Sequence, residues 1–332
     1  RESSNTEIER GESSNVQINP TQLDHFVFNS IGTPQTAGVS FTVTIQAVDQ
    51  YENVITSFSS PVNLAAQNGS ISPTQTAGFT AGSWTGDVLL FEAGDNNRIN
   101  ASSNGKSGES NVFTVDAGEL KNFKFNEISS PQTAGTPFTV SITAVDEWDN
   151  RLDNFSESVS LEEKTGTLSV EETSTSQTSA FGNGVWSGNV VITKASSDIR
   201  ITASRSGIES NSNLFTVSAA ALHHFEIDPP GTQSVGSSFL IHVSARDIHS
   251  NIVTGFNGKV GLEDESTTLS PDSSDNFIGG EWSGNVTISS PYENNRINVA
   301  DNNFHTGTSD QFDVVEAVVN YFDISLPPQS TA

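Results

Sequence analysis

Two residue types and one kind of segment are missing from this chain. It has no cysteine, so it can form no disulfide, no thiolate metal site and no cysteine nucleophile. It has no methionine either, even at position 1, and we expect a mature or excised piece of a longer protein. No apolar run has the length of a transmembrane helix and no signal peptide is present. We therefore expect any export signal or anchor to lie outside these residues.

Positive charge is scarce. Lys and Arg number 14 against 40 Asp and Glu, so the net charge is −26. A protein this acidic is repelled by nucleic acid and by anionic membrane surfaces, and neither is expected as a partner. Two interpretations of the acidity stay open. Carboxylates on solvated strands usually serve solubility alone, and the alternative is that some of them bind a divalent cation.

One motif recurs along the chain at the spacing of a domain. Leu-x-x-Phe, once weakened to Val-x-x-Phe, begins at spacings of 97, 102 and 97 residues, at Leu23, Leu120, Leu222 and Val319. A second motif, Gly-x-Trp-(Ser/Thr)-Gly, keeps the same period at Trp84, Trp186 and Trp282. A period near 100 residues is too long for a solenoid unit and matches a self-contained domain. The sequence therefore predicts a tandem array of three similar repeats.

Alternating apolar and polar residues predict β-strands in every repeat. The longest alternating segments are 41–48, 138–145 and 239–246. A shorter apolar unit closes each repeat, at 112–115, 214–217 and 311–314. Clusters of Gly, Asn, Ser and Asp between them have the composition of turns, and no amphipathic helix is evident. The pattern predicts an all-β fold of antiparallel β-sandwiches with about seven strands each.

The joins between the predicted domains are about four residues long. The predicted division is 1–19 as the terminal strand of a preceding repeat, 20–117, 118–219 and 220–317 as the three repeats, and 318–332 as the first strand of a following repeat. Linkers this short leave little freedom between domains and predict an extended rod. The two incomplete ends fit a window cut from a longer array. They also fit strands that add to the sheets of neighbouring subunits.

A polar motif, Asp-x-(Tyr/Trp/His)-x-Asn, follows the long strand of each repeat. It begins at Asp49, Asp146 and Asp247. Asp caps turns by accepting backbone N–H bonds and Asn tolerates the left-handed region, so the motif is interpreted as a structural turn. The alternative is calcium bound by oxygen ligands. The candidate ligands are Asp49, Glu52, Asp146, Asp149 and Asp247.

The Trp motif has a structural interpretation and a functional one. Its two glycines are able to take positive φ, which favours a turn leading into a strand with the Trp covering one end of the core. Alternatively, Trp84, Trp186 and Trp282 are platforms on which a surface polysaccharide stacks. No nucleophile elbow, zinc-type His motif or phosphate-cradling loop occurs, so we predict that the chain is not an enzyme and, calcium aside, uses no cofactor.

The combined pattern resembles a known family. Thr-Ala-Gly-x-x-Phe-Thr-Val-x-Ile-x-Ala-Val-Asp-x-x-x-Asn, then Gly-x-Trp-Ser-Gly and Gly-x-Ser-Asn-x-Phe-Thr-Val, resembles the bacterial immunoglobulin-like repeats of the Big type, as in invasin- and intimin-like proteins. The resemblance covers nearly the whole chain. These families usually carry Gly just before the Asn of the turn, where this chain has Glu52, Asp149 and Ser250.

This resemblance implies tandem immunoglobulin-like sandwiches in a secreted or cell-surface prokaryotic protein, and it supplies no catalytic residue. We therefore expect a structural extracellular rod: a filament, surface-layer or adhesin-stalk component. Its partners would be neighbouring copies or adjacent repeats, and strand sharing between units is one way to assemble them. The alternatives are an array of carbohydrate-binding modules, with surface polysaccharide as the partner, and an ancillary region of a secreted enzyme.

Overall fold

The structure is a computed structural model of the chain, and it describes residues 19–316. Across these residues every regular element is a β-strand, which confirms the all-β prediction. The same span contains no helix that is long and apolar enough to cross a membrane. The strands predicted within 1–19 and 318–332 lie, apart from Asn19, outside the described residues.

The described residues form two compact units. The first unit contains the first repeat as far as Phe123, together with 143–156 and 182–185 of the second repeat. The second unit contains 124–142, 157–181 and the chain from Trp186 onward. The turn that follows the long strand of the second repeat therefore belongs to the same compact unit as the first repeat.

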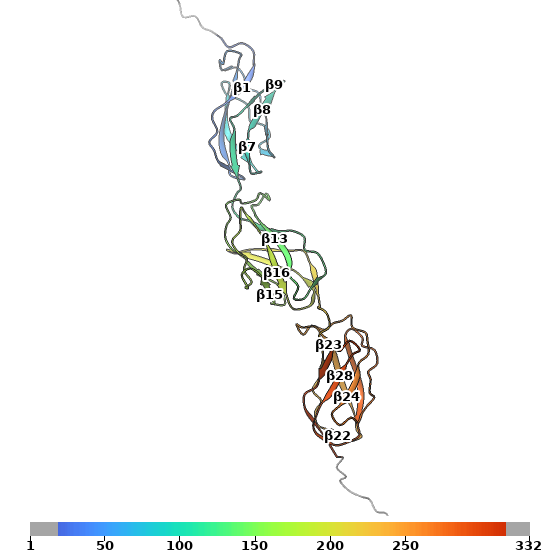
Figure 1. Cartoon of the computed structure of the whole chain (residues 1–332). Coiled ribbons are helices and arrows are strands. Elements are labelled where there is room, and N and C mark those ends of the chain that lie inside the picture. Colours follow the sequence, from blue (N-terminus) through green and yellow to red (C-terminus); the bar gives the residue numbers. More distant parts are fainter. Residues whose placement is uncertain (1–18, 317–332) are drawn as a thin grey trace, which may run out of the picture. The chain divides into compact units, whose positions relative to one another are not determined.

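The first repeat consists of ten strands in three sheets. It is the part drawn in blue to blue-green in Figure 1. The strands are β1 (His25–Phe28), β2 (Gln35–Thr36), β3 (Phe41–Val48), β4 (Asn63–Ala66), β5 (Ile71–Ser72), β6 (Ser83–Leu90), β7 (Gly94–Asn97), β8 (Ile99–Ser103), β9 (Lys106–Glu109) and β10 (Phe113–Asp116). The sheet orders are β1-β3-β6-β5, β2-β10-β7 and β4-β8-β9.

The second repeat follows the same order of elements. Its strands are β11 (Asn122–Phe125), β12 (Gln132–Thr133), β13 (Phe138–Val145), β14 (Ser160–Glu162), β15 (Leu168–Val170), β16 (Val185–Ile192), β17 (Ser196–Ile199), β18 (Thr202–Arg205), β19 (Ile208–Asn211) and β20 (Phe215–Ser218). They form the sheets β11-β13-β16-β15, β12-β20-β17 and β14-β18-β19.

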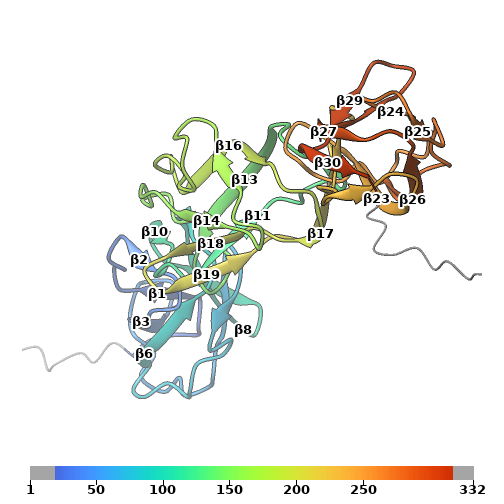
Figure 2. The same cartoon turned by 90° about the horizontal axis from the view of Figure 1, so that it is seen from below.

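The third repeat has the same topology. Its strands are drawn in orange to red in Figure 2. Its strands are β21 (His224–Ile227), β22 (Gln233–Ser234), β23 (Ser238–Arg246), β24 (Gly261–Asp264), β25 (Leu269–Ser270), β26 (Glu281–Ile288), β27 (Tyr292–Asn295), β28 (Ile297–Ala300), β29 (Thr306–Thr308) and β30 (Phe312–Val315). The sheets are β21-β23-β26-β25, β22-β30-β27 and β24-β28-β29.

The alternating sequence of the long strands explains how each core forms. In β3, Val43 and Ile45 are buried while Thr42 is exposed, because successive side chains of a strand face opposite sides of the sheet. The first core combines such residues with buried residues of the other sheets, including Leu64 and Phe113. The result is a sandwich in which apolar side chains of facing sheets pack together.

Phenylalanine fills much of the core of the first and third repeats. In the first, the rings of Phe58 and Phe79 meet edge to face at 5.1 Å, and Phe26 lies 5.7 Å from Phe58. The third repeat has the same trio, with Phe256 and Phe277 at 5.0 Å. An aromatic pair in this geometry stabilises a core by about 0.5–1.5 kcal/mol beyond its buried area. Abundant Phe thus compensates for a low overall content of apolar residues.

The strands differ from the prediction in number and in direction. Each repeat has ten short elements where about seven strands were predicted. One extra element arises because the opening segment divides into β1, paired with β3, and β2, paired with β10. Pro34 immediately precedes β2 and has no N–H to donate to a ladder, which favours a break at this point. The β2–β10 pair is parallel, unlike the predicted antiparallel sandwich.

Candidate functional site

The Asp of each polar motif is buried and fully occupied by hydrogen bonds. Asp146 is 2% exposed. Its Oδ1 accepts the N–H groups of Trp148 and Asn150, both at 2.9 Å, and its Oδ2 accepts the Asn150 side-chain amide at 2.8 Å. Oδ2 also accepts the N–H of Gly118 in the linker, at 2.8 Å. The carboxylate therefore closes the turn and anchors the linker that leads into its own repeat.

The other two motifs repeat this arrangement. Asp49 accepts the linker N–H of Thr21 at 2.9 Å, and Asp247 accepts that of Ala220 at 2.8 Å. Hydrogen bonds to a carboxylate favour its charged form. The pKa of Asp49 is lowered, chiefly by the Thr21 N–H. At Asp146 burial acts to raise the pKa, but the hydrogen bonds from Asn150, Gly118 and Trp148 outweigh it, and the pKa is lowered.

The residue before the Asn of each turn adopts the left-handed conformation. Its φ is 63° at Glu52, 65° at Asp149 and 61° at Ser250. Glycine enters this region without steric cost, whereas other residues do so rarely. All three turns therefore take a backbone conformation that favours Gly, although none of the three repeats has Gly at this position.

The Asn that ends the turn of the second repeat hydrogen-bonds the backbone of the first repeat. The Asn150 side-chain amide donates to the carbonyl oxygen of Phe91 at 2.7 Å. Its Oδ1 accepts the N–H of Ala93 at 2.9 Å. All three residues belong to the first compact unit. One side chain thus satisfies a backbone acceptor and a backbone donor two residues apart, in the turn that follows β6.

The same contact occurs between the third repeat and the second, inside the second compact unit. Asn251 donates to the carbonyl oxygen of Thr193 at 2.7 Å, and its Oδ1 accepts the N–H of Ala195 at 2.8 Å. Asn251 is only 2% exposed. Two equivalent contacts at equivalent positions show that the Asn side chain is a regular element of these joints.

The central aromatic or imidazole residue of the turn covers a glycine of the preceding repeat. The Trp148 ring lies 5.8 Å from that of Phe91 and rests on Gly38, where an added Cβ would come within 1.7 Å of the indole. His249 occupies the same place over Gly135, where an added Cβ would be 1.9 Å from Nε2. Both glycines have φ of +72°. Each joint therefore requires Gly on the preceding repeat for conformation and for space.

The sequence predicts these joints only in part. The motif predicts a turn capped by Asp, which the structure contains, but not the bonds that Asn150 and Asn251 make to another repeat. The signal that could have identified them is the recurrence of Asn four residues after each Asp, next to linkers too short to keep the turn away from the preceding repeat.

The residues proposed as calcium ligands do not form a metal site in the described part of the chain. Glu52 lies 3.2 Å from Nε2 of His25, and the oxygens of Asp49, Asp146 and Asp247 accept N–H groups. Within residues 19–316 no group of three or more His, Asp or Glu side chains is placed to hold a metal ion. The geometry favours the turn interpretation of these Asp residues, and calcium binding stays a prediction.

The Trp residues proposed as stacking platforms are part of the cores. Trp84, Trp186 and Trp282 are 8%, 3% and 8% exposed. Each indole lies over the second glycine of its motif: an added Cβ at Gly188 would be 2.4 Å from the ring of Trp186. Sugar stacking needs an open aromatic face, so this burial favours the core interpretation. The second glycine is required because the indole occupies the space of a side chain.

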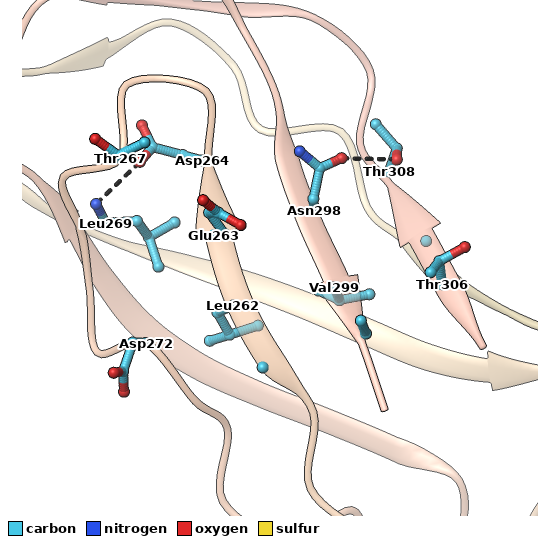
Figure 3. Close-up of a pocket in the computed structure, with 13 residues that line it drawn as sticks. Leu262, Glu263, Asp264, Thr267, Leu269, Asp272, Asn298, Val299, Thr306 and Thr308 are labelled. Atoms are coloured by element: carbon cyan, nitrogen blue, oxygen red, sulfur yellow. Dashed lines mark hydrogen bonds between the residues drawn. The ribbon is translucent and has the colours of Figure 1, made fainter. Parts of the chain in front are cut away.

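The third repeat contains a surface hollow of about 690 Å³ over β24, β28 and β29 (Figure 3). Gly261 pairs with Ala300 at this point, where the first repeat pairs Asn63 with Ser102. Both side chains of the pair in the third repeat are smaller than their counterparts in the first. Figure 3 shows the bond from Thr308 to Asn298 on one side, and the bond from the Leu269 N–H to Asp264 on the other.

Comparison with known proteins gives similarities among solved structures only. No family model matches the sequence, and no curated protein matches it. The chain is similar to FdeC, an adhesin of Escherichia coli, at 18% identity over 91% of this chain and 100% of that chain, with a TM-score of 0.40. It is similar to invasin, a bacterial integrin-binding protein, at 13% identity over 88% of this chain and 60% of that chain, with a TM-score of 0.33.

A third similarity is to domains 4–9 of the surface-layer protein SbsC, at 17% identity over 90% of this chain and 48% of that chain, with a TM-score of 0.27. The chain is a tandem array of immunoglobulin-like β-sandwiches. Bacterial adhesin and surface-layer structures are thus among the solved structures to which the chain is similar.

Proposed function

We propose that this chain is a structural, non-enzymatic part of an extracellular or cell-surface protein. In this proposal three immunoglobulin-like domains, 20–117, 118–219 and 220–317, form a rod that serves a filament, a surface layer or an adhesin stalk. One observation carries it: Asn150 and Asn251 bond to the preceding repeat with the same geometry. A spacer needs joints that resist bending, and these bonds provide such a joint.

The energy of such a joint is adequate for the purpose. A neutral hydrogen bond contributes about 0.5–1.5 kcal/mol net, so the two bonds of one Asn supply about 1–3 kcal/mol. The repeats are already connected through a short linker, and docking therefore needs no bimolecular encounter. The Asp carboxylate adds a second restraint because it holds the linker N–H of Gly118 or Ala220. Linker and turn are thereby fixed to one buried group.

Strand sharing between copies is the finer form of this proposal. It would use the segments 11–18 and 321–332, which lie outside the described residues. Carbohydrate binding is the alternative function, and the burial of the three motif Trp residues weighs against it. An ancillary role beside a secreted catalytic domain is compatible with the same rod.

The test compares the full chain with two variants by electron microscopy of single molecules. The double variant Asn150→Ala, Asn251→Ala removes both joint contacts. Asn53→Ala is the matched control, because Asn53 makes the same bonds within its turn but, among the described residues, none to another repeat. We expect end-to-end distances to spread widely in the double variant and to stay narrow in the control. Equal distributions in all three proteins would contradict the proposed role of the joints.

A further inference from the structure

The first repeat carries a third copy of the joint turn. Asn53 stands where Asn150 and Asn251 stand, but its amide donates to the carboxylate of Asp49, at 3.2 and 3.3 Å, and the residue is exposed. Among the described residues its Oδ1 accepts no hydrogen bond. The atoms that bind a preceding repeat elsewhere are therefore presented to solvent here.

The rest of this turn is already in the docked form. Asp49 is completely buried and accepts the N–H groups of Tyr51 and Asn53 at 2.9 and 3.0 Å. Glu52 has the same left-handed φ as its counterparts. The linker N–H of Thr21 is bound as in the other two repeats. Because the turn needs no rearrangement to dock, binding there has little ordering cost.

The central aromatic position is open as well. Tyr51 is 69% exposed, whereas Trp148 in the same position is 37% exposed and rests on Gly38. A large exposed aromatic next to an amide with a free acceptor is a combination typical of protein interfaces.

We propose that the turn Tyr51–Asn53 is a docking site for the end of another immunoglobulin-like repeat of this kind. This inference rests on the proposed function and names the partner of one of its sites. The partner offers three groups, as the first and second repeats do: a backbone C=O, an N–H two residues further on, and a glycine with positive φ. Tyr51 covers the glycine and Asn53 bonds the other two groups.

The end of the third repeat lacks one of these groups. Gly236 has φ of +72° with nothing within 4 Å of an added Cβ, and Ser289 stands where Phe91 and Thr193 stand. Pro291, however, occupies the position of Ala93 and Ala195, and proline has no N–H. A second copy that docked through its third repeat would leave Oδ1 of Asn53 without a donor. The occupant we infer is therefore an immunoglobulin-like repeat with a residue other than proline at this position, so that all three groups are present.

The test places such a repeat in front of the turn. In a head-to-tail fusion, Val315 of an upstream copy is joined to Pro20 of a downstream copy, which reproduces the linker length between the first and second repeats. The upstream copy carries either Pro291 or Pro291→Ala. Tyr51 of the downstream copy is replaced by p-benzoylphenylalanine, and light-induced crosslinks are located by mass spectrometry. The same replacement at Trp148 is the internal standard.

We expect the probe at 51 to crosslink to the turn around Gly236 of the upstream copy, with a yield at least several-fold higher for Pro291→Ala than for Pro291. Adding Asn53→Ala downstream should remove that gain. The inference is overturned if the probe at 148 crosslinks around Gly38 but the probe at 51 does not reach Gly236 in either fusion. It is also overturned if single chains crosslink to second copies as efficiently as the fusions do internally. Failure of the probe at 148 would instead overturn the joint described in the proposed function.

Discussion

Replacing Asn251 by Ala should expose one identifiable backbone amide. The N–H of Ala195 donates to Oδ1 of Asn251 at 2.8 Å, and the Asn251 amide donates to Thr193 at 2.7 Å. At about 0.5–1.5 kcal/mol per bond, the joint loses about 1–3 kcal/mol. Each 1.4 kcal/mol corresponds to a factor of ten. The hydrogen-exchange protection of the Ala195 amide should therefore fall by about 5- to 150-fold.

The measurement is amide hydrogen exchange of the full chain followed by nuclear magnetic resonance. Ala93 supplies an internal control, because its N–H is held by Asn150 at the other joint and should keep its protection. Asn53→Ala supplies the matched variant and should leave both amides unchanged. Unaltered exchange at Ala195 in Asn251→Ala would refute the reasoning, since it would mean that the Asn bond does not keep this amide from water.

Three further predictions concern stability. The pKa values of Asp146 and Asp247 are lowered in the folded chain. The stability that these carboxylates supply is therefore present above their unfolded pKa of about 3.9 and is lost as the pH falls through their folded pKa values. Urea unfolding between pH 6 and pH 2 should show this loss of stability, and Asp247→Asn should make the stability depend less on pH. Gly188→Ala should destabilise the second repeat by about 1–3 kcal/mol, because the new Cβ meets the Trp186 ring. Gly182→Ala should be nearly neutral, because an added Cβ there has no atom within 4 Å. Equal unfolding midpoints for the two variants would contradict this prediction. Phe304 is 93% exposed and has φ of +67°, a conformation that costs a residue other than Gly about 1–2 kcal/mol. Phe304→Gly should therefore raise the thermal unfolding midpoint of the third repeat. A lowered midpoint would show that this backbone strain is absent.

The fold was predictable because the period of two is strong in the long strands. Residues 41–47 alternate apolar and polar side chains, and the structure buries the alternate residues Val43, Ile45 and Ala47. The pairing of β2 with β10 was not predictable in the same way. A two-residue strand has no period to detect, and its parallel direction depends on the packing of the whole repeat.

The joint was predictable only as far as its local chemistry. An Asp followed by Asn four residues later indicates a capped turn, and the bonds from Asp49 to Tyr51 and Asn53 are of this local kind. The bond that the Ala93 N–H donates to Oδ1 of Asn150 joins residues 57 positions apart. No local pattern encodes such a partner, because the turn of the preceding repeat contributes only a backbone C=O and a backbone N–H. Any residue except proline supplies both groups.

Both halves of the joint are carried by every repeat: the Asp-to-Asn turn at one end, and the glycine with the backbone C=O at the other. Duplication or deletion of one whole repeat in the gene would therefore create a new joint with its contacts already encoded. Array length could change during evolution without a compensating mutation at either neighbour. Pro291 is the exception, because it has no N–H to donate. A repeat inserted directly after the third repeat would form a joint with one hydrogen bond fewer, and this joint would be the least stable one in a lengthened array.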